Sequence, residues 1–399
     1  NINLFIVKFT NRYLKNIKYS GLKGKALKID SRDIPTLNEI KNILPKHCFS
    51  IKTRTSLRYL LQSLMIQMVV LALGFLIPFS SKMIPIWVFY SFLSGTTAMG
   101  FWVLAHECGH GAFSKNKNLE TFVGYTLHSL LLVPYFSWQR SHAVHHRFTN
   151  NITKGETHVP IVIDGDGVRE KKGGRNEINI SKSLGKTKYG IMQLILHLIF
   201  GWPAYLLTGS TGGIEYGTSN HFWPKKPFSN KLWLSKWSKK VWLSDIGVVI
   251  TLIILIKLSS IFGIVPLIAF YFGPLLIVNC WLVIYTWLHH TETDVPHLSN
   301  SEFTFIRGAF LTIDRPYGQI INFLHHNIGS SHVVHHIYSN IPHYHAKEAT
   351  KAIKKAFPKI YLYNPEPIYK ALWNVSCNCI AVDSKVRRGL YVWKSSYGK

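Results

Sequence analysis

Acidic residues and cysteines are scarce in this 399-residue sequence. It contains 19 Asp and Glu against 46 Lys and Arg, which gives a formal net charge of +27. The five cysteines are an odd number, so we expect free thiols and no disulfide framework. In a soluble protein, this shortage of acidic residues would suggest a nucleic-acid partner.

Charged residues are also missing from two apolar runs, residues 59–79 and 84–105. Each run is close to the roughly 20 residues that cross a bilayer. A third apolar block, residues 246–287, is about twice that length. Small residues and a proline interrupt it near its middle: Ser259, Ser260, Gly263 and Pro266. We therefore predict an all-α integral membrane protein with four transmembrane helices, arranged as hairpins over residues 59–105 and 246–288.

The distribution of basic residues predicts the orientation in the membrane. Residues 1–58 carry thirteen Lys and Arg against three acidic residues, whereas the turn inside each hairpin has one basic residue or none. The positive-inside rule therefore places residues 1–58, 106–245 and 289–399 in the cytosol, together with both termini. The two longer segments are expected to form a helical cap. Since the basic charge would then face anionic lipid headgroups, we expect no nucleic-acid partner.

Three shorter segments have an amphipathic pattern. Thr36-Leu37-Asn38-Glu39 has the spacing of a capping box and predicts a short helix, either at the membrane interface or packed on the cytosolic cap. Residues 121–136 and 191–207 are too short or too interrupted to span comfortably, so we expect amphipathic or re-entrant segments. A full crossing by either would move the later histidine clusters to the opposite face of the membrane.

Histidines gather in three short clusters, all within the predicted cytosolic segments. A spacing of three or four residues on a helix places the side chains on one face, where they can converge on a metal. Eight neutral imidazoles at one site suit two iron ions better than one zinc ion, which takes about four ligands. The predicted ligands are His106, His110, His142, His145, His146, His332, His335 and His336.

Two other functions use parts of the same pattern. His106-Glu107-Cys108-Gly109-His110 matches the motif of zinc proteases in which the glutamate is the general base, and it lies at the end of a predicted membrane helix. An intramembrane zinc protease would leave the other six histidines unused. A metal transporter would be expected to carry ionisable residues inside its spans, and these spans have almost none.

The sequence resembles the membrane-bound fatty acyl desaturases, in particular the microsomal delta-12 (omega-6) and omega-3 enzymes of plants and fungi. The resemblance covers most of the chain, from Pro45-Lys46-His47-Cys48-Phe49 to about Ala356. Three histidine clusters in this order and spacing are a specific signal. The other matching stretches are His110-Gly111-Ala112-Phe113-Ser114, Gly201-Trp202-Pro203, Arg307-Gly308-Ala309, Asp314-Arg315 and Ile341-Pro342-His343-Tyr344-His345.

The resemblance implies a di-iron centre held by the eight clustered histidines. Such a centre uses O2 and two electrons to insert a cis double bond into an acyl chain. In related desaturases a further histidine just beyond the last span also binds iron, and His290 is the best match. His289 and His326 would then support ligands by hydrogen bonding. Glu107 is expected either to orient a histidine or a bound water, or only to contribute charge at a helix end.

The resemblance also implies partners and a location. The sequence has no His-Pro-Gly-Gly haem segment and no nucleotide-binding fingerprint, so the electrons are expected to come from partner proteins. In this family the usual donors are cytochrome b5 and its reductase. The expected membrane is the endoplasmic reticulum. The expected substrates are acyl chains of membrane lipids, with phospholipid favoured over coenzyme A esters.

The position of the double bond is predicted from resemblance alone. Glu107 is commoner in the delta-12 type, which converts oleoyl to linoleoyl lipid. Gly111 and Asn327-Ile328-Gly329 are closer to the omega-3 type, which acts on linoleoyl lipid. We favour delta-12 desaturation, with omega-3 (delta-15) desaturation as the alternative. Hydroxylases, conjugases and acetylenases share the same histidine clusters.

Overall fold

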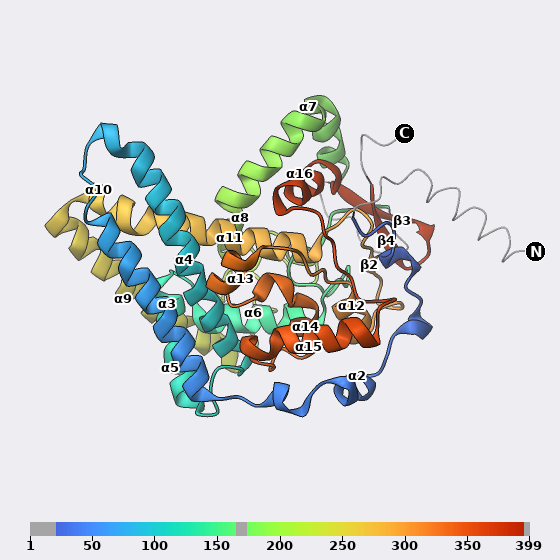
Figure 1. Cartoon of the computed structure of the whole chain (residues 1–399). Coiled ribbons are helices and arrows are strands. Elements are labelled where there is room, and N and C mark those ends of the chain that lie inside the picture. Colours follow the sequence, from blue (N-terminus) through green and yellow to red (C-terminus); the bar gives the residue numbers. More distant parts are fainter. Residues whose placement is uncertain (1–20, 165–173, 395–399) are drawn as a thin grey trace, which may run out of the picture.

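The computed structural model describes residues 21–164 and 174–394, so residues 1–20, 165–173 and 395–399 of the predicted cytosolic segments lie outside the described residues. Most of the described chain is helical (Figure 1). The helices up to the second hairpin are α2 (Leu37–Ile43), α3 (Thr53–Gly74), α4 (Ile84–His110), α5 (Lys117–Leu130), α6 (Tyr135–Arg147), α7 (Gly174–Ile195) and α8 (Gly201–Thr208). The later ones are α9 (Lys236–Phe262), α10 (Ile264–Leu267), α11 (Gly273–His290), α12 (Phe305–Phe310), α13 (Gln319–Leu324), α14 (His332–Ile337), α15 (His343–Ala356) and α16 (Ile368–Asn378). Short 3-10 or π turns include η3 (Lys46–Phe49), η5 (Leu196–Phe200) and η6 (Ile268–Phe272).

The predicted apolar runs are helical except at residues 75–79, and they form two long hairpins. α3 and α4 make the first, and α9, α10 and α11 make the second. In Figure 1 both hairpins project to the same side of the molecule, at the left. Their outer surfaces expose apolar side chains such as Val69 and Ile256, with 62% and 69% of the residue surface accessible. Exposed apolar surface of this extent is expected of helices that contact lipid.

Among the described residues, five helical segments are long and apolar enough to cross a membrane. Four of them overlap the predicted spans: Thr53–Gly74, Ser81–His110, Lys236–Phe262 and Ile264–His290. The first helix begins earlier than the predicted run 59–79 and ends at Gly74, five residues before the run does. The fifth, Asn176–Thr208, contains the residues 191–207 that were expected to be amphipathic or re-entrant. Its helix continues because η5 joins α7 to α8, and Pro203 falls in the first turn of α8, where a missing N–H is tolerated.

The prediction of an all-α fold is wrong, because two C-terminal strands and two short earlier segments form a four-stranded sheet in the order β1-β3-β4-β2. β3 (Ala381–Arg387) and β4 (Leu390–Lys394) are an antiparallel hairpin, with Gly389 in its turn at a φ of 81° that favours glycine. β1 (Val162–Asp164) pairs with β3 in parallel, and β2 (His297–Leu298) pairs with β4. Strands of two or three residues are too short to show an alternating pattern. The fold is therefore mostly helical.

The N-terminal segment contains a capped helix that packs on the rest of the protein. The predicted capping box is confirmed: Thr36 Oγ1 accepts a hydrogen bond from Glu39 N at 3.2 Å, and Glu39 Oε2 accepts one from Thr36 N at 2.7 Å. Ile40 of α2 and Ile353 of α15 are fully buried in one apolar core. This contact favours the alternative in which α2 packs on the cap. All five cysteines are free thiols, as predicted.

Candidate metal centre

The first histidine cluster lies on the last turns of α4. His106 and His110 share a helix face because they are four residues apart. The helix ends at Gly111, whose φ of 75° suits glycine. Gly109 lies where Trp138 of α6 packs, and a Cβ there would be 2.6 Å from the Trp138 ring. This close approach allows α4 and α6 to bring their histidines together.

The second cluster lies on α6, which begins directly after Pro134. Ser244 of α9 anchors the start of this helix, because its Oγ accepts a hydrogen bond from Phe136 N at 2.9 Å. Further along α6, the Trp138 ring stacks on the His142 ring with centroids 4.6 Å apart. These two contacts fix the position of α6 and the orientation of His142.

The third cluster lies on α14, a six-residue helix that is too short to be stable alone. Asp314 fixes its start, because Oδ1 accepts hydrogen bonds from His332 N and Val333 N at 2.6 and 3.0 Å. The Tyr361 hydroxyl donates to Oδ2 of Asp314 at 2.6 Å. Burial raises the pKa of Asp314 to about 6, although these three donors favour its carboxylate form.

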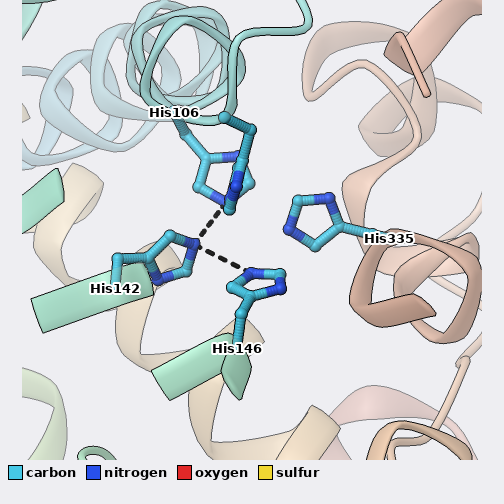
Figure 2. A group of neighbouring side chains, drawn as sticks. His106, His142, His146 and His335 are labelled. Carbon is cyan, nitrogen blue, oxygen red and sulfur yellow. Dashed lines mark hydrogen bonds between the residues drawn. The ribbon is translucent and has the colours of Figure 1, made fainter. Parts of the chain in front are cut away.

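Five histidines from three helices converge on one point, which we call the first histidine group: His106, His110, His142, His146 and His335. Each offers one ring nitrogen, and these atoms all lie within 4.8 Å of one another. Nε2 of His142 is 2.8 Å from Nε2 of His106 and 3.2 Å from Nε2 of His146. Figure 2 shows His106, His142, His146 and His335 pointing toward one another.

A second histidine group lies beside the first and consists of His145, His290, His332 and His336. Nε2 of His290 is 3.2 Å from Nε2 of His145 and 3.0 Å from Nε2 of His332. The ligand atoms of His145, His290 and His336 lie within 4.8 Å of one another. The His336 ring also stacks on His146 of the first group, with centroids 4.1 Å apart. The structure therefore brings together all eight clustered histidines and adds His290 to them.

The surroundings keep these imidazoles neutral, as metal ligands have to be. Burial first, and neighbouring histidines second, lower the pKa values of His142, His146 and His335 well below the usual range. Nε2 of His335 and Nε2 of His336 are buried without a hydrogen-bond partner. A buried polar atom without a partner is costly, and a shared cation would relieve that cost. Each group therefore fits a metal ion.

Thr149 orients the His336 ring. Its hydroxyl donates a hydrogen bond to the His145 carbonyl oxygen at 2.6 Å, so its oxygen can accept one from Nδ1 of His336 at 3.1 Å. A proton on Nδ1 leaves the lone pair of Nε2 available for a metal. Sequence spacing predicts no role for Thr149 or Asp314. Thr149 is 187 residues from His336, and Asp314 lies outside the helix that carries His332.

Glu107 binds the start of α15. Its Oε2 accepts a hydrogen bond from His343 N at 2.9 Å. The contact places the Glu107 carboxyl at the start of α15 and not at an end of α4, and burial raises its pKa to about 8. A protease base would instead have to act at a metal between His106 and His110. The contact with α15 therefore argues against the zinc-protease interpretation.

The hydrogen bonds of His289 and His326 go to groups other than the predicted metal ligands, so the expected hydrogen-bond support of the ligands is not seen. Nε2 of His289 lies 3.1 Å from the Gly329 carbonyl oxygen, and its ring stacks on that of His332 with centroids 4.0 Å apart. Nε2 of His326 lies 3.1 Å from Ser63 Oγ. Of the candidate histidines outside the three clusters, His290 is therefore the one that joins a histidine group.

An apolar cavity borders both histidine groups. Helices α4, α8 and α11 supply much of its apolar wall, which includes Met99, Trp102, Trp202, Leu282 and Val283. Its polar side is formed largely by histidines, among them His106, His142, His145, His290 and His332. A hydrocarbon chain could lie in this cavity with one stretch beside the histidine groups.

Comparison with known proteins identifies the family. A family model described as "Fatty acid desaturase" matches residues 82–366, which include all three histidine clusters. The chain is 36% identical over 365 residues to a delta(12) fatty acid desaturase of Calendula officinalis, covering 90% of this chain and 91% of the relative. It is 36% identical over 369 residues to the omega-6 fatty acid desaturase, endoplasmic reticulum isozyme 1, of Glycine max, covering 91% of each. It is 34% identical over 370 residues to an oleoyl-12-hydroxylase of Ricinus communis, again covering 91% of each. The chain therefore belongs to the fatty acid desaturase family and is an oxidoreductase.

Proposed function

We propose that this protein is a delta-12 desaturase that converts oleoyl to linoleoyl lipid with two iron ions, O2 and two electrons. The observation that carries the proposal is the pair of buried histidine groups beside an apolar cavity. An unactivated methylene has no acidic proton, so acid–base side chains alone cannot remove its hydrogens. The site instead offers metal ligands and room for a hydrocarbon.

The nine histidines would hold the two irons. The first histidine group offers five nitrogens, one more than tetrahedral zinc takes, and the second offers four. When bound, two irons supply the oxidising power needed to remove hydrogen from adjacent methylenes. Neutral imidazoles would leave the ions more cationic than carboxylates would. Asp314 and Thr149 would keep the third-cluster ligands in position.

The apolar cavity would hold the acyl chain. Met99 of α4 and Val283 of α11 line it, and both helices belong to the proposed membrane hairpins, so the chain could enter from the bilayer. His145 and His290 line the same cavity. Since His106 and His142 of the first group line it too, the reacting methylenes would lie beside both histidine groups, while the apolar wall excludes water from the reaction.

The named relatives support the delta-12 position. Those of Calendula and Glycine are named as delta(12) and omega-6 desaturases. The Ricinus relative is named as a hydroxylase at nearly the same identity, so overall identity does not separate the two products. Distinctions of one methylene or hydroxyl in an apolar site amount to about 1–3 kcal/mol. Omega-3 desaturation is the alternative for the same site.

We also propose four membrane crossings, with residues 1–58, 106–245 and 289–399 on the cytosolic face and the hairpins 59–105 and 246–288 in the membrane. His145 and His290 belong to one histidine group, so the chain between them has to cross the membrane an even number of times. Three candidate spans lie in that interval, and therefore not all of them can cross. α9 and α11 form a hairpin, which supports crossings there and an interfacial or re-entrant α7–α8.

The proposed location is the endoplasmic reticulum membrane, supported by the name of the Glycine relative. Cytochrome b5 and its reductase are the proposed electron donors. With the histidine groups at the cytosolic ends of α4 and α11, a soluble electron-carrying domain could approach from the cytosol while the acyl chain occupies the membrane side.

Product analysis in yeast tests the proposal. In a strain that makes only monounsaturated fatty acids, expression of this chain is expected to produce linoleate from endogenous oleate, measured as fatty acid methyl esters. A triene formed only when linoleate is supplied would instead establish omega-3 desaturation. A hydroxylated product would assign a different reaction to the same site. Membrane insertion and iron content of the expressed protein serve as controls.

Enlarging a cavity side chain tests where the acyl chain binds. Val283→Phe should place a ring in the cavity and lower oleate conversion by about tenfold or more, because small volume differences in apolar pockets already change rates to that extent. Iron content should stay the same. The matched control is Val249→Phe on α9, where the residue is half exposed on the outer surface. Equal activity of the two variants would contradict the assignment of the cavity.

Removing one ligand tests the first histidine group. His335→Ala should lower turnover by more than about 100-fold. Even residues that only hydrogen-bond to a metal ligand typically change activity by about 10- to 100-fold when they are replaced. Membrane insertion should be unaffected because His335 lies outside the proposed spans. His297→Ala, a buried histidine on β2 outside both groups, controls for general loss of folding. Retained turnover in the His335 variant would remove it from the ligand set.

A further inference from the structure

A cluster of mixed ligands lies outside the two histidine groups. It consists of His47, Cys48, His345 and Glu348, each of which offers one ligand atom, and these atoms lie within 4.8 Å of one another. His47 and Cys48 are neighbours on η3. His345 and Glu348 are three residues apart on α15 and so share one face of that helix. We call this set the mixed ligand cluster.

Two members of the mixed ligand cluster offer buried ligand atoms. Cys48 is a completely buried free thiol, and Nε2 of His345 is buried without a hydrogen-bond partner. The other two members are half exposed, and Nε2 of His47 lies 2.8 Å from Oε2 of Glu348. Cys48 and His345 are therefore the inner members of the cluster. His47 and Glu348 are the outer members, and solvent can reach the cluster on their side.

The two halves of the cluster are already fixed beside each other. Cys48 N donates a hydrogen bond to the Pro45 carbonyl oxygen at 2.9 Å, which closes η3. Just beyond η3, Lys52 N donates to the Tyr344 hydroxyl of α15 at 2.8 Å. Cys48 also belongs to the apolar core that includes Ile353 of α15. An ion could therefore bind without a large movement of either element.

We propose that the mixed ligand cluster is a zinc site that fastens the N-terminal segment to α15. Two imidazoles, a thiolate and a carboxylate form a four-ligand set of the kind that zinc binds tetrahedrally. With bond lengths of about 2.0–2.3 Å, ligand atoms of such a site are roughly 3.3–3.8 Å apart, so small side-chain rotations would complete it. Zinc would replace the thiol proton of Cys48, which is released to solvent, and the other ligands would bind as neutral imidazoles and a carboxylate.

A surface ion pair between His47 and Glu348 would explain only half of the cluster. It would leave Nε2 of His345 buried without a hydrogen-bond partner, and it would not involve the neighbouring Cys48 thiol. Zinc at this position has a structural consequence, because η3 directly precedes α3 and α15 follows the third histidine cluster. The ion would tie the beginning of the first proposed spanning helix to the part of the cap that carries three metal-site histidines.

Cobalt substitution tests the proposal on the full-length protein purified in detergent. Co2+ bound by a thiolate has a sulfur-to-metal charge-transfer band that imidazole ligands do not produce, so the two histidine groups cannot give this signal. We expect the band at one equivalent of thiolate-bound cobalt, and one zinc per chain when the protein is loaded with zinc alongside iron. Cys48→Ser should abolish both. Cys280→Ser is the matched control and should retain both, since serine can keep the hydrogen bond that Cys280 donates to the Leu198 carbonyl oxygen.

Variants at the outer ligands keep the test independent of folding. His47→Asn and Glu348→Gln change half-exposed side chains and should each weaken cobalt binding at this site by about tenfold or more. A charge-transfer band that survives in Cys48→Ser, or its absence from the parent protein, would overturn the zinc site. Iron content and desaturase activity are measured on the same samples. They report on the proposed function separately, because none of the four residues belongs to the histidine groups.

Discussion

The close packing of nine neutral imidazoles in two adjacent groups, with His110 and His142 partly buried and the others buried, is the constraint on which the rest of the structure depends. Nitrogens packed 2.8–3.2 Å apart in a protein interior are stable only if protons or cations lie between them. The chain meets this constraint by bringing the ends of α4 and α11 against α6 and the short α14. Asp314 and Thr149 fix helices and ring orientations from outside, and Gly109 lets Trp138 approach closely enough to close the assembly.

The same constraint limits how the chain can lie in a membrane. His145 and His290 are 145 residues apart in sequence yet share one group, so the segment between them has to return to the face from which it left. The hairpin of α9 and α11 satisfies this requirement, whereas an additional crossing by α7–α8 would not. The apolar cavity is lined by residues of α4, α8 and α11 and borders the histidine groups.

Sequence patterns predicted the parts that depend on local spacing. Two apolar hairpins and the capping box at Thr36 are found as predicted, and the three histidine clusters do converge. Resemblance to the family was needed to single out His290, since no spacing distinguishes it from His289. β1 and β2 were missed because they are too short to show periodicity and depend on the β3–β4 hairpin as a template. β3 and β4 have seven and five residues, with Gly389 between them, so that hairpin could have been predicted from the sequence and was not. The partners of Glu107 and Thr149, and the meeting of His47 with Glu348, are contacts between distant segments that no local pattern encodes.

The most direct test of the central claim is the iron content of the purified protein, measured per chain by elemental analysis together with its zinc content. The account predicts about two irons per chain, reduced in variants of either histidine group, with any zinc confined to the mixed ligand cluster and lost in Cys48→Ser. A content of one iron, or zinc that persists in that variant in place of iron, would contradict a di-iron site formed by nine histidines.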